Sequence, residues 1–261
     1  MNKDNTPSED AALPSGPKYM SKADSERPKP KRFYKEVSLK ASNDQYEILL
    51  DGRVIKTPMK STLAVKTEPL GIAISDEWSA QGEEIDSETM ILTKLANTAL
   101  DRVAPRRGDI LEELVSYGAN DLLCYRATDP NSLVELEQKV WDPILNWIKE
   151  QHNIRLELAA GVVHVSQSSS EITKLAGLYD QFDEFELTAL HNMTTMLGSA
   201  VLPLALILGE WETEDVWAAA HLEENFQIER WGEDEQAQNR RKFRHGEFLE
   251  TYNFYQLSRK S

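Results

Sequence analysis

The chain has 261 residues, enough for one large domain or two small ones with a hydrophobic core. Its formal net charge of -15 argues against nucleic acid or an anionic membrane as the main partner, and mildly favours a basic partner surface. The single cysteine, Cys124, excludes an intramolecular disulfide and suggests a reducing compartment. Its apolar neighbours indicate a buried structural thiol.

Residues 1–30 are rich in Pro, Ser, Lys and Asp and contain few large apolar side chains, so we expect a disordered tail. This segment has no apolar core of a secretory signal, and it is too acidic and arginine-poor for a mitochondrial transit peptide. The longest apolar run, residues 200–208, is much shorter than the roughly 20 residues that a membrane span requires. We therefore expect a soluble intracellular protein without membrane insertion.

The first ordered elements are predicted to be strands. Val37 and Leu39 alternate with polar residues, as in a half-buried strand. Residues 46–50 and 53–57 flank Asp51-Gly52, which is a strong β-hairpin signal, and residues 62–65 supply one more strand. A small antiparallel sheet should therefore open the fold.

From Thr67 onward the apolar residues recur with helical spacing. The first expected helix is capped by Thr67 and carries Leu70, Ile74 and Trp78 on one face, and two more follow over 88–103 and from Pro105 to near Gly118. A long helix is expected from Asn131 or Ser132 to Ile148, broken or bent at Pro143. After it we expect a helix capped by Ser170 and an apolar central helix over 185–208 that is kinked at Pro203. Residues 121–126 fit a short strand or a helical turn, and residues 155–165 allow one short strand. Residues 235–261 continue as a polar, basic segment.

The stretch 212–236 is predicted to be one helix that Thr213 caps and Gly232 ends. At about 100° per residue its apolar side chains form a very wide arc, which also contains Glu223, Glu224, Gln227 and Arg230. Polar groups need partners when they are buried, so this conflict indicates a functional or specificity-giving site.

A purely structural interpretation stays open for the aromatic residues. Trp217, Phe226 and Trp231 fit a hydrophobic core slightly better than a binding surface, and Trp78 fits packing better than contact with a partner. For Glu224 and Gln227 we favour function, because burying them without a purpose is costly. The basic cluster Arg240, Arg241, Lys242 and Arg244 is explained by local charge compensation with the acidic residues 233–235.

The sequence offers little evidence for catalysis. It contains no G-x-x-x-x-G-K-[ST] or G-x-G-x-x-G segment, and its five histidines lack the spacing of metal ligands. Glu223 and Glu224 point about 100° apart on a helix, which is poor geometry for joint work on one bond. The alternative function that we retain is a small-molecule hydrolase or isomerase that uses carboxylate acid–base chemistry, with His191 or His221.

A series of short segments occurs in an order that resembles a known family. The segments are Arg32-Phe33-Tyr34-Lys35, Leu50-Asp51-Gly52-Arg53, Asp76-Glu77-Trp78-Ser79-Ala80-Gln81, Met90-Ile91-Leu92-Thr93, Asn97-Thr98-Ala99-Leu100-Asp101, Asp121-Leu122-Leu123-Cys124-Tyr125-Arg126, Trp141-Asp142-Pro143, Glu223-Glu224-Asn225-Phe226-Gln227 and Trp231-Gly232-Glu233-Asp234. Over about residues 31–245 the chain is similar to the assembly chaperones of the F1 sector of ATP synthase, the ATP-twelve type, which hold the unassembled α subunit.

The resemblance implies an α+β fold in which a small, mostly antiparallel β domain is followed by a larger α-helical domain. We place the tail at 1–30, the β-rich domain with one helix at 31–84 and the helical domain at 85–261. The resemblance also implies no enzymatic activity and no cofactor, and the histidine spacing predicts no metal site. The α subunit of F1 would be the partner, shielded at its subunit interface until the β subunit replaces the chaperone.

The partner-binding residues that we predict are Glu223, Glu224, Gln227, Trp231 and Trp78, with no catalytic residue among them. The acidic residue of the family's motif maps to Glu223 or Glu224, and we favour Glu224 because it shares a helix face with Gln227 and Trp231. We expect the free chaperone to be monomeric. Since residues 1–30 lack an import signal, a bacterial cytoplasm is expected rather than a mitochondrial matrix.

Overall fold

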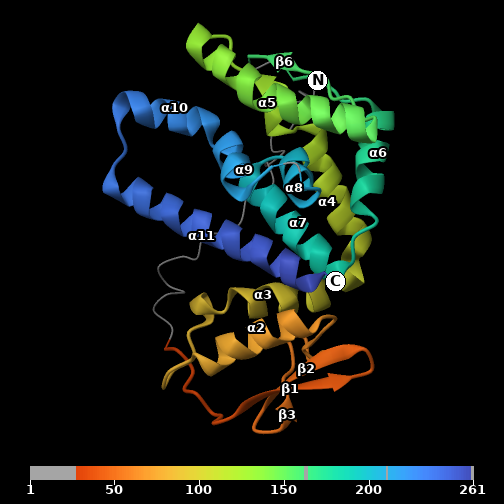
Figure 1. Cartoon of the computed structure of the whole chain (residues 1–261), viewed down its shortest axis with the longest axis vertical. Coiled ribbons are helices and arrows are strands. Elements are labelled where there is room, and N and C mark those ends of the chain that lie inside the picture. Colours follow the sequence, from red (N-terminus) through yellow and green to blue (C-terminus); the bar gives the residue numbers. More distant parts are fainter. Residues whose placement is uncertain (1–27, 162–163, 210, 260–261) are drawn as a thin grey trace, which may run out of the picture.

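The computed structural model describes residues 28–161, 164–209 and 211–259, which form a small sheet below a larger group of helices (Figure 1). The four strands at the start are β1 (Val37–Ser42), β2 (Gln45–Leu50), β3 (Arg53–Val54) and β4 (Ala64–Val65). β2 pairs antiparallel with each of the other three. The predicted α+β fold, with a sheet first and helices after it, is confirmed.

The turn between β2 and β3 explains the register of the sheet. Asp51 and Gly52 have φ angles of 47° and 74°, the left-handed pair that a tight hairpin turn requires. Leu50 consequently lies opposite Arg53, and the buried residues Ile48 and Leu50 share one face of β2 while the buried Leu49 lies on the other. The predicted hairpin is confirmed, although β3 is shorter than the sequence suggests.

The first helix, α2 (Glu68–Ser79), joins the sheet to the rest of the chain. Leu70 and Ile74 are buried on its inner face, as predicted. Thr67 occupies the N-cap position, but its side chain makes no hydrogen bond to the helix. Its Oγ1 instead donates to the carbonyl oxygen of Leu257 at 2.5 Å, so the start of α2 is tied to the far end of the chain.

The remaining elements alternate helices with short turns and two very short strands. They are a 3-10 turn (Ser87–Thr89), α3 (Ile91–Thr98), a π turn (Ala99–Val103), a 3-10 turn (Ala104–Arg106), α4 (Arg107–Ala119), a 3-10 turn (Leu122–Cys124), β5 (Tyr125–Arg126), α5 (Asn131–His152), β6 (Ala159–Ala160), α6 (Ser169–Tyr179), α7 (Glu184–Leu197), α8 (Val201–Ile207), α9 (Thr213–Ala220), α10 (Leu222–Trp231) and α11 (Glu235–Ser258). β5 and β6 pair in parallel, so residues 121–126 form both a helical turn and a strand.

Two predicted helix breaks are not found where we expect them. The helix α5 continues through the exposed Pro143 from Asn131 to His152, so no break occurs there, and a bend at Pro143 stays a prediction. The expected helix over 185–208 is divided into α7 and α8 at Gly198, not kinked at Pro203. Gly198 ends α7 in the left-handed conformation, with φ of 67°.

A buried carboxylate explains why a new helix starts after Gly198. Asp121 Oδ2 accepts hydrogen bonds from the backbone N–H groups of Ala200 and Val201, at 2.8 and 3.2 Å, and from Ser199 Oγ at 3.0 Å. These are the donors that the first turn of α8 leaves unpaired. Asp121 therefore caps α8 from a segment almost 80 residues earlier, which periodicity within 185–208 could not reveal.

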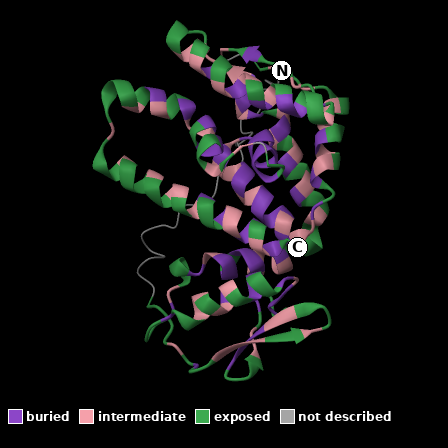
Figure 2. Cartoon of the chain, viewed as in Figure 1, coloured by how far each residue is buried: buried purple, intermediate pink, exposed green. Residues whose placement is uncertain are grey.

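One hydrophobic core runs from the sheet to the helices. It includes Ile48 and Val65 of the sheet, Ile74 of α2 and Leu190 of α7, all of which have no exposed surface. Figure 2 shows that buried residues concentrate in α7 and α8, at the centre of the helical part. The division at residue 84 stays a prediction, and this shared core packs across it.

The predicted tail lies outside the described residues except for residues 28–30. Within those three, Pro30 accepts a hydrogen bond from Ile85 N at 2.8 Å, and Lys29 Nζ lies 2.6 Å from Asp86 Oδ2. Residues 29 and 30, which belong to the predicted tail, therefore already contact Ile85 and Asp86 of the same chain. No helix in the described ranges combines the length and hydrophobicity that crossing a bilayer demands.

Candidate functional site

The stretch 212–236, which is predicted to be one helix, contains two helices, α9 and α10, which meet at His221. The backbone of His221 leaves the helical region, at φ of -111° and ψ of 23°. Its imidazole Nδ1 lies 2.9 Å from the carbonyl oxygen of Trp217 and its ring stacks on the indole at 3.9 Å. The predicted N-cap is also wrong, since Glu212 and not Thr213 precedes the first helical residue, whereas Gly232 ends α10 as expected.

The inner side of α10 is apolar. Leu222 and Phe226 are buried, four residues apart and therefore on one face of the helix. The Arg230 guanidinium lies 4.0 Å from the centre of the Phe226 ring, and its Nη2 donates to Ser132 Oγ at 2.9 Å. These contacts hold α10 on the start of α5.

Glu223 lies on the same side as Arg230 and approaches a second carboxylate, Glu137 of α5. Glu137 is fully buried: its Oε2 accepts a hydrogen bond from Ala127 N at 2.9 Å, and its Oε1 has no hydrogen-bond partner among the described residues. Burial and, to a lesser extent, the negative charge of Glu223 raise the pKa of Glu137. Glu223 is therefore near α5, although its side chain is exposed.

Glu224, Gln227 and Trp231 are spaced three and four residues apart and form the outer face of α10. All three are exposed, and Trp231 is 77% exposed, the largest value among the exposed large hydrophobic residues of the described chain. The prediction that these polar groups share a buried apolar sector is wrong, because the break at His221 and the end of the helix at Gly232 turn this face outward. An exposed indole among polar groups is typical of a contact residue.

Trp78 is not brought together with these residues. It is half-buried on α2, in the lower part of the molecule, whereas α10 lies in the upper part (Figure 1). Its ring packs edge-on against Tyr34 at 5.6 Å and joins a small apolar cluster with Leu50, Ile85 and Met90. A contact of Trp78 with a partner stays a prediction.

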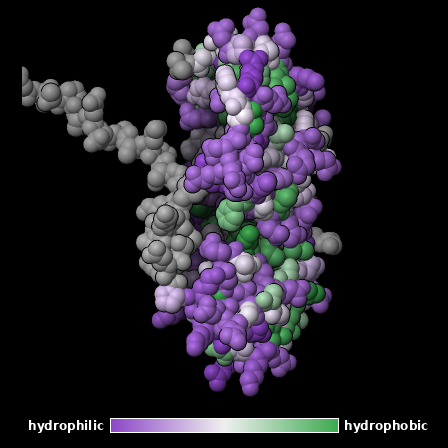
Figure 3. Space-filling view, turned by 90° about the vertical axis from the view of Figure 1, so that its left-hand side faces the viewer, coloured by the Kyte–Doolittle hydropathy of each residue, from purple (hydrophilic) through white to green (hydrophobic). Residues whose placement is uncertain are grey.

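α10 and α11 run as an arm beside the body of the helical part (Figure 1), and a cleft of about 420 Å³ lies between α11 and the α9–α10 segment. Its lining residues are Trp217, Glu233, Gln238, Arg241, Lys242 and His245. Arg241 donates through Nη2 to Asn225 Oδ1, which ties α11 to α10. We call this the arm cleft. On the face shown in Figure 3, hydrophilic residues predominate and hydrophobic ones gather mainly at mid-height.

The local charge compensation predicted for the basic cluster on α11 involves no direct ion pair of Arg240, Arg241 or Lys242 in the described part of the chain. Arg244 instead donates to the carbonyl oxygen of Met196 at 3.1 Å. Glu233 nevertheless lines the arm cleft together with Arg241 and Lys242, without a direct ion pair to either.

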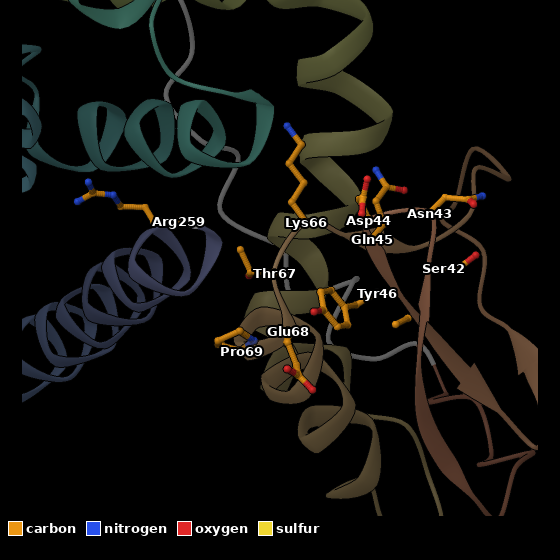
Figure 4. Close-up of a pocket in the computed structure, with 11 residues that line it drawn as sticks. Ser42, Asn43, Asp44, Gln45, Tyr46, Lys66, Thr67, Glu68, Pro69 and Arg259 are labelled. Atoms are coloured by element: carbon orange, nitrogen blue, oxygen red, sulfur yellow. The ribbon is translucent and has the colours of Figure 1, made fainter. Parts of the chain in front are cut away.

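A second hollow, of about 630 Å³, lies at the edge of the sheet (Figure 4). The β1–β2 turn, the start of α2 and Arg259 form its walls, with Asp44 and Glu68 as its carboxylates. Lys66 in this wall is paired with Asp183 and Glu184, at 3.0 and 2.9 Å. The lining contains no histidine and brings no carboxylate pair to a reactive side chain.

Neither histidine of the retained enzyme alternative lines one of the two hollows. His191 Nε2 lies 2.8 Å from Glu113 Oε2 on the surface, and His221 is stacked on Trp217. Burial lowers the pKa of His221. Cys124 is buried, and burial raises the pKa of its thiol, as expected for a structural cysteine. In the part of the chain that the structure describes, no three His, Cys, Asp or Glu side chains are grouped as metal ligands.

The sequence and the structure of the chain are similar to those of known proteins. The family model described as ATP12 chaperone protein matches residues 31–149. The crystal structure of Atp12 from Paracoccus denitrificans superposes with a TM-score of 0.84 at 36% identity, covering 88% of this chain and 99% of that one. The chain belongs to the ATP12 chaperone family.

Other proteins to which the chain is similar are bacterial and fungal. A solved structure from Agrobacterium tumefaciens has a TM-score of 0.84 and 38% identity, over 88% of this chain and 87% of that one. The mitochondrial atp12 protein of Schizosaccharomyces pombe is 23% identical over 233 residues, which are 84% of this chain and 80% of that protein. The mitochondrial ATP12 protein of Saccharomyces cerevisiae is 24% identical over 249 residues, 78% of this chain and 77% of that protein. The family is that of the chaperones of ATP synthase assembly.

Proposed function

We propose that this ATP12-family chaperone binds the unassembled α subunit of F1-ATPase, shields its subunit interface, and is replaced when the β subunit arrives. The observation that carries the proposal is the outer face of α10, where the exposed Trp231 stands beside Glu224 and Gln227. An aromatic side chain supplies contact area, and the neighbouring carboxylate and amide supply specificity. Such a mixed surface binds an apolar interface while remaining displaceable.

The contacts of α10 favour Glu224 over Glu223 as the acidic contact residue. Glu223 is turned toward Glu137 of α5, on the side that Arg230 binds. Glu224 lies with Gln227 and Trp231 on the side without such contacts. Glu223 then acts by positioning the helix, and Trp78, on the opposite part of the molecule, would make a separate contact with the same partner.

The chaperone is proposed to act without catalysis and without a cofactor, as a monomer when free, in a bacterial cytoplasm. The support for the compartment is the higher identity to the bacterial relatives, 36% and 38%, than to the mitochondrial yeast proteins, 23% and 24%. Support for a non-catalytic role comes from the family and from the lining of the two hollows, which contains neither His191 nor His221.

The decisive experiment is co-expression with the F1 α subunit, with and without this protein. We expect soluble α subunit and assembled F1 to fall when the chaperone is deleted, and to return when it is supplied on a plasmid. Equal α-subunit solubility and equal F1 assembly in the two strains would refute the proposal.

Glu224→Lys tests the surface directly. Because this exposed side chain makes no hydrogen bond or ion pair within the described residues, the fold should be retained, while α-subunit affinity measured by pull-down or interferometry should fall at least about tenfold. Glu229→Lys is the matched control, since it makes the same charge change at an exposed position of the same helix outside the Glu224–Gln227–Trp231 face. Equal losses in both variants would show a general charge effect and remove Glu224 from the site.

A further inference from the structure

The arm cleft contains opposite charges that do not pair with each other. Arg241 and Lys242 line it together with Glu233, yet no ion pair joins any of them among the described residues. Glu233 Oε1 is a buried atom and has no hydrogen-bond partner in that part of the chain. Leaving such a group unsatisfied is costly, so the cleft is suited to a guest that supplies a donor.

A second unsatisfied atom lies in the same cleft. His245 Nε2 is buried and lacks an aligned hydrogen bond in the described structure, although Glu214 Oε1 approaches it to 3.2 Å. The His245 ring packs against Trp217 at 4.9 Å, so the indole forms an apolar wall beside it. The cleft therefore offers cations, one unpaired acceptor and an aromatic surface within a volume of about 420 Å³.

We propose that the arm cleft binds an acidic segment of the client polypeptide. A carboxylate side chain of the segment pairs with Lys242 and Arg241, and a backbone N–H donates to Glu233 Oε1. The aliphatic part of the segment packs on Trp217. This proposal extends the proposed function, since it assigns a charge signature to one part of the client, next to the outer face of α10.

The charge distribution of the chain gives such a cleft discriminating power. With a net charge of -15, the chain as a whole repels acidic segments, so only a local cationic site can hold one. A client that carries an acidic segment beside a surface matching Glu224 and Trp231 is then selected over a client with one of these features alone. Charge complementarity at two adjacent places also fixes the orientation in which the client binds.

The test uses the full chain and fluorescein-labelled peptides of ten residues, in which Leu alternates with Glu, Gln or Lys. Fluorescence anisotropy should show binding of the Glu peptide at least about tenfold tighter than the Gln peptide, with weakening as salt is raised. Lys242→Glu should abolish this preference. Arg240→Glu is the matched control, because Arg240 is exposed on the same helix and does not line the cleft. It should retain the preference.

Equal binding of the Glu and Gln peptides, preferential binding of the Lys peptide, or equal loss in Lys242→Glu and Arg240→Glu would each overturn the inference. Circular dichroism on each variant establishes that the helices are retained, as expected for exposed side chains. The readout contains no α subunit, so its outcome is independent of the co-expression experiment. A positive peptide result with no effect on F1 assembly would refute the proposed function and leave the cleft assignment standing.

Discussion

Asp121 shows how much a single side chain contributes to this fold. It is fully buried and accepts hydrogen bonds from Leu123 N, Ser199 Oγ and the first N–H groups of α8. Burial disfavours its charged form more strongly than these hydrogen bonds favour it, and raises its pKa to about 6. The carboxyl group therefore changes protonation near neutral pH.

This shift predicts a pH dependence of stability. A folded-state pKa above the unfolded value of 3.8 means that the folded chain binds the proton more tightly. The contribution of Asp121 to the free energy of unfolding is therefore largest below about pH 4. It is lost as the pH rises through about 6, by an amount on the order of 3 kcal/mol. In Asp121→Asn this dependence should vanish, because the amide does not titrate. Between pH 5 and pH 7.5 the wild type should therefore lose unfolding free energy relative to the variant.

Urea unfolding at several pH values measures this difference. Asp215→Asn is the control, because Asp215 is an exposed carboxylate near the start of α9. A wild-type-to-variant difference that stays constant over this pH range would contradict the raised pKa of Asp121.

At the scale of single elements, Gly232 sets the direction in which the chain leaves α10. Its φ of 78° and ψ of 175° lie in a region that only glycine adopts without strain. Gly232→Ala should therefore lower the free energy of unfolding by about 1–3 kcal/mol, as measured by thermal or urea denaturation. The expected consequence is a less ordered connection between α10 and α11.

Gly177→Ala provides the comparison for this substitution. Gly177 lies within α6, has an ordinary helical backbone, and a Cβ placed there would meet no other atom within 4 Å. Alanine is the better helix former by about 1 kcal/mol, so this variant should be neutral or more stable. If both variants lose the same stability, the backbone of Gly232 is not the cause.

The elements also show what the sequence could predict. The Asp51-Gly52 hairpin, the inner face of α2 and the end of α10 at Gly232 follow from local rules and are confirmed. The split between α7 and α8 could not be predicted, because Asp121 is close to the split only in space. The helix α11 is not evident from the sequence because many polar residues surround the few that it buries, namely Phe248, Thr251, Phe254, Tyr255 and Ser258.

The candidate site, too, is only partly predictable from the sequence. Helical spacing alone places Glu224, Gln227 and Trp231 on one face. Whether that face points inward or outward depends on the break at His221 and on the neighbouring α5 and α11, which no pattern within 212–236 contains. The proximity of Glu137 to Glu223 and the arm cleft likewise arise only when distant segments pack.

At the scale of the whole molecule, Lys66 connects the sheet part to the helical part. It follows β4, and its Nζ lies 3.0 and 2.9 Å from the carboxylates of Asp183 and Glu184 at the start of α7. All three side chains are partly buried, with exposures of 26%, 30% and 28%, so screening by solvent is incomplete. Lys66→Met should lower the unfolding free energy by about 1–2 kcal/mol, observed as a reduced Tm.

A local ion pair serves as the comparison for Lys66→Met. Lys94 Nζ lies 3.0 Å from Glu88 Oε1, with exposures of 45% and 46%, and both residues belong to the same short stretch of chain. Lys94→Met should change the stability by less than about 0.5 kcal/mol. An equal reduction in Tm for both variants would indicate that the Lys66 pairs do not join the two parts of the molecule.

The bond between Thr67 and Leu257 has a consequence for biosynthesis. Phe254, Tyr255 and Ser258 are buried, and the hydroxyl of Thr67 donates to a carbonyl group 190 residues later. While the chain is still on the ribosome, α2 lacks this acceptor and the core lacks these side chains. The sheet formed by the earliest ordered residues therefore completes its packing only after translation has passed α11, and a chain interrupted before that helix would leave apolar surface of α7 uncovered.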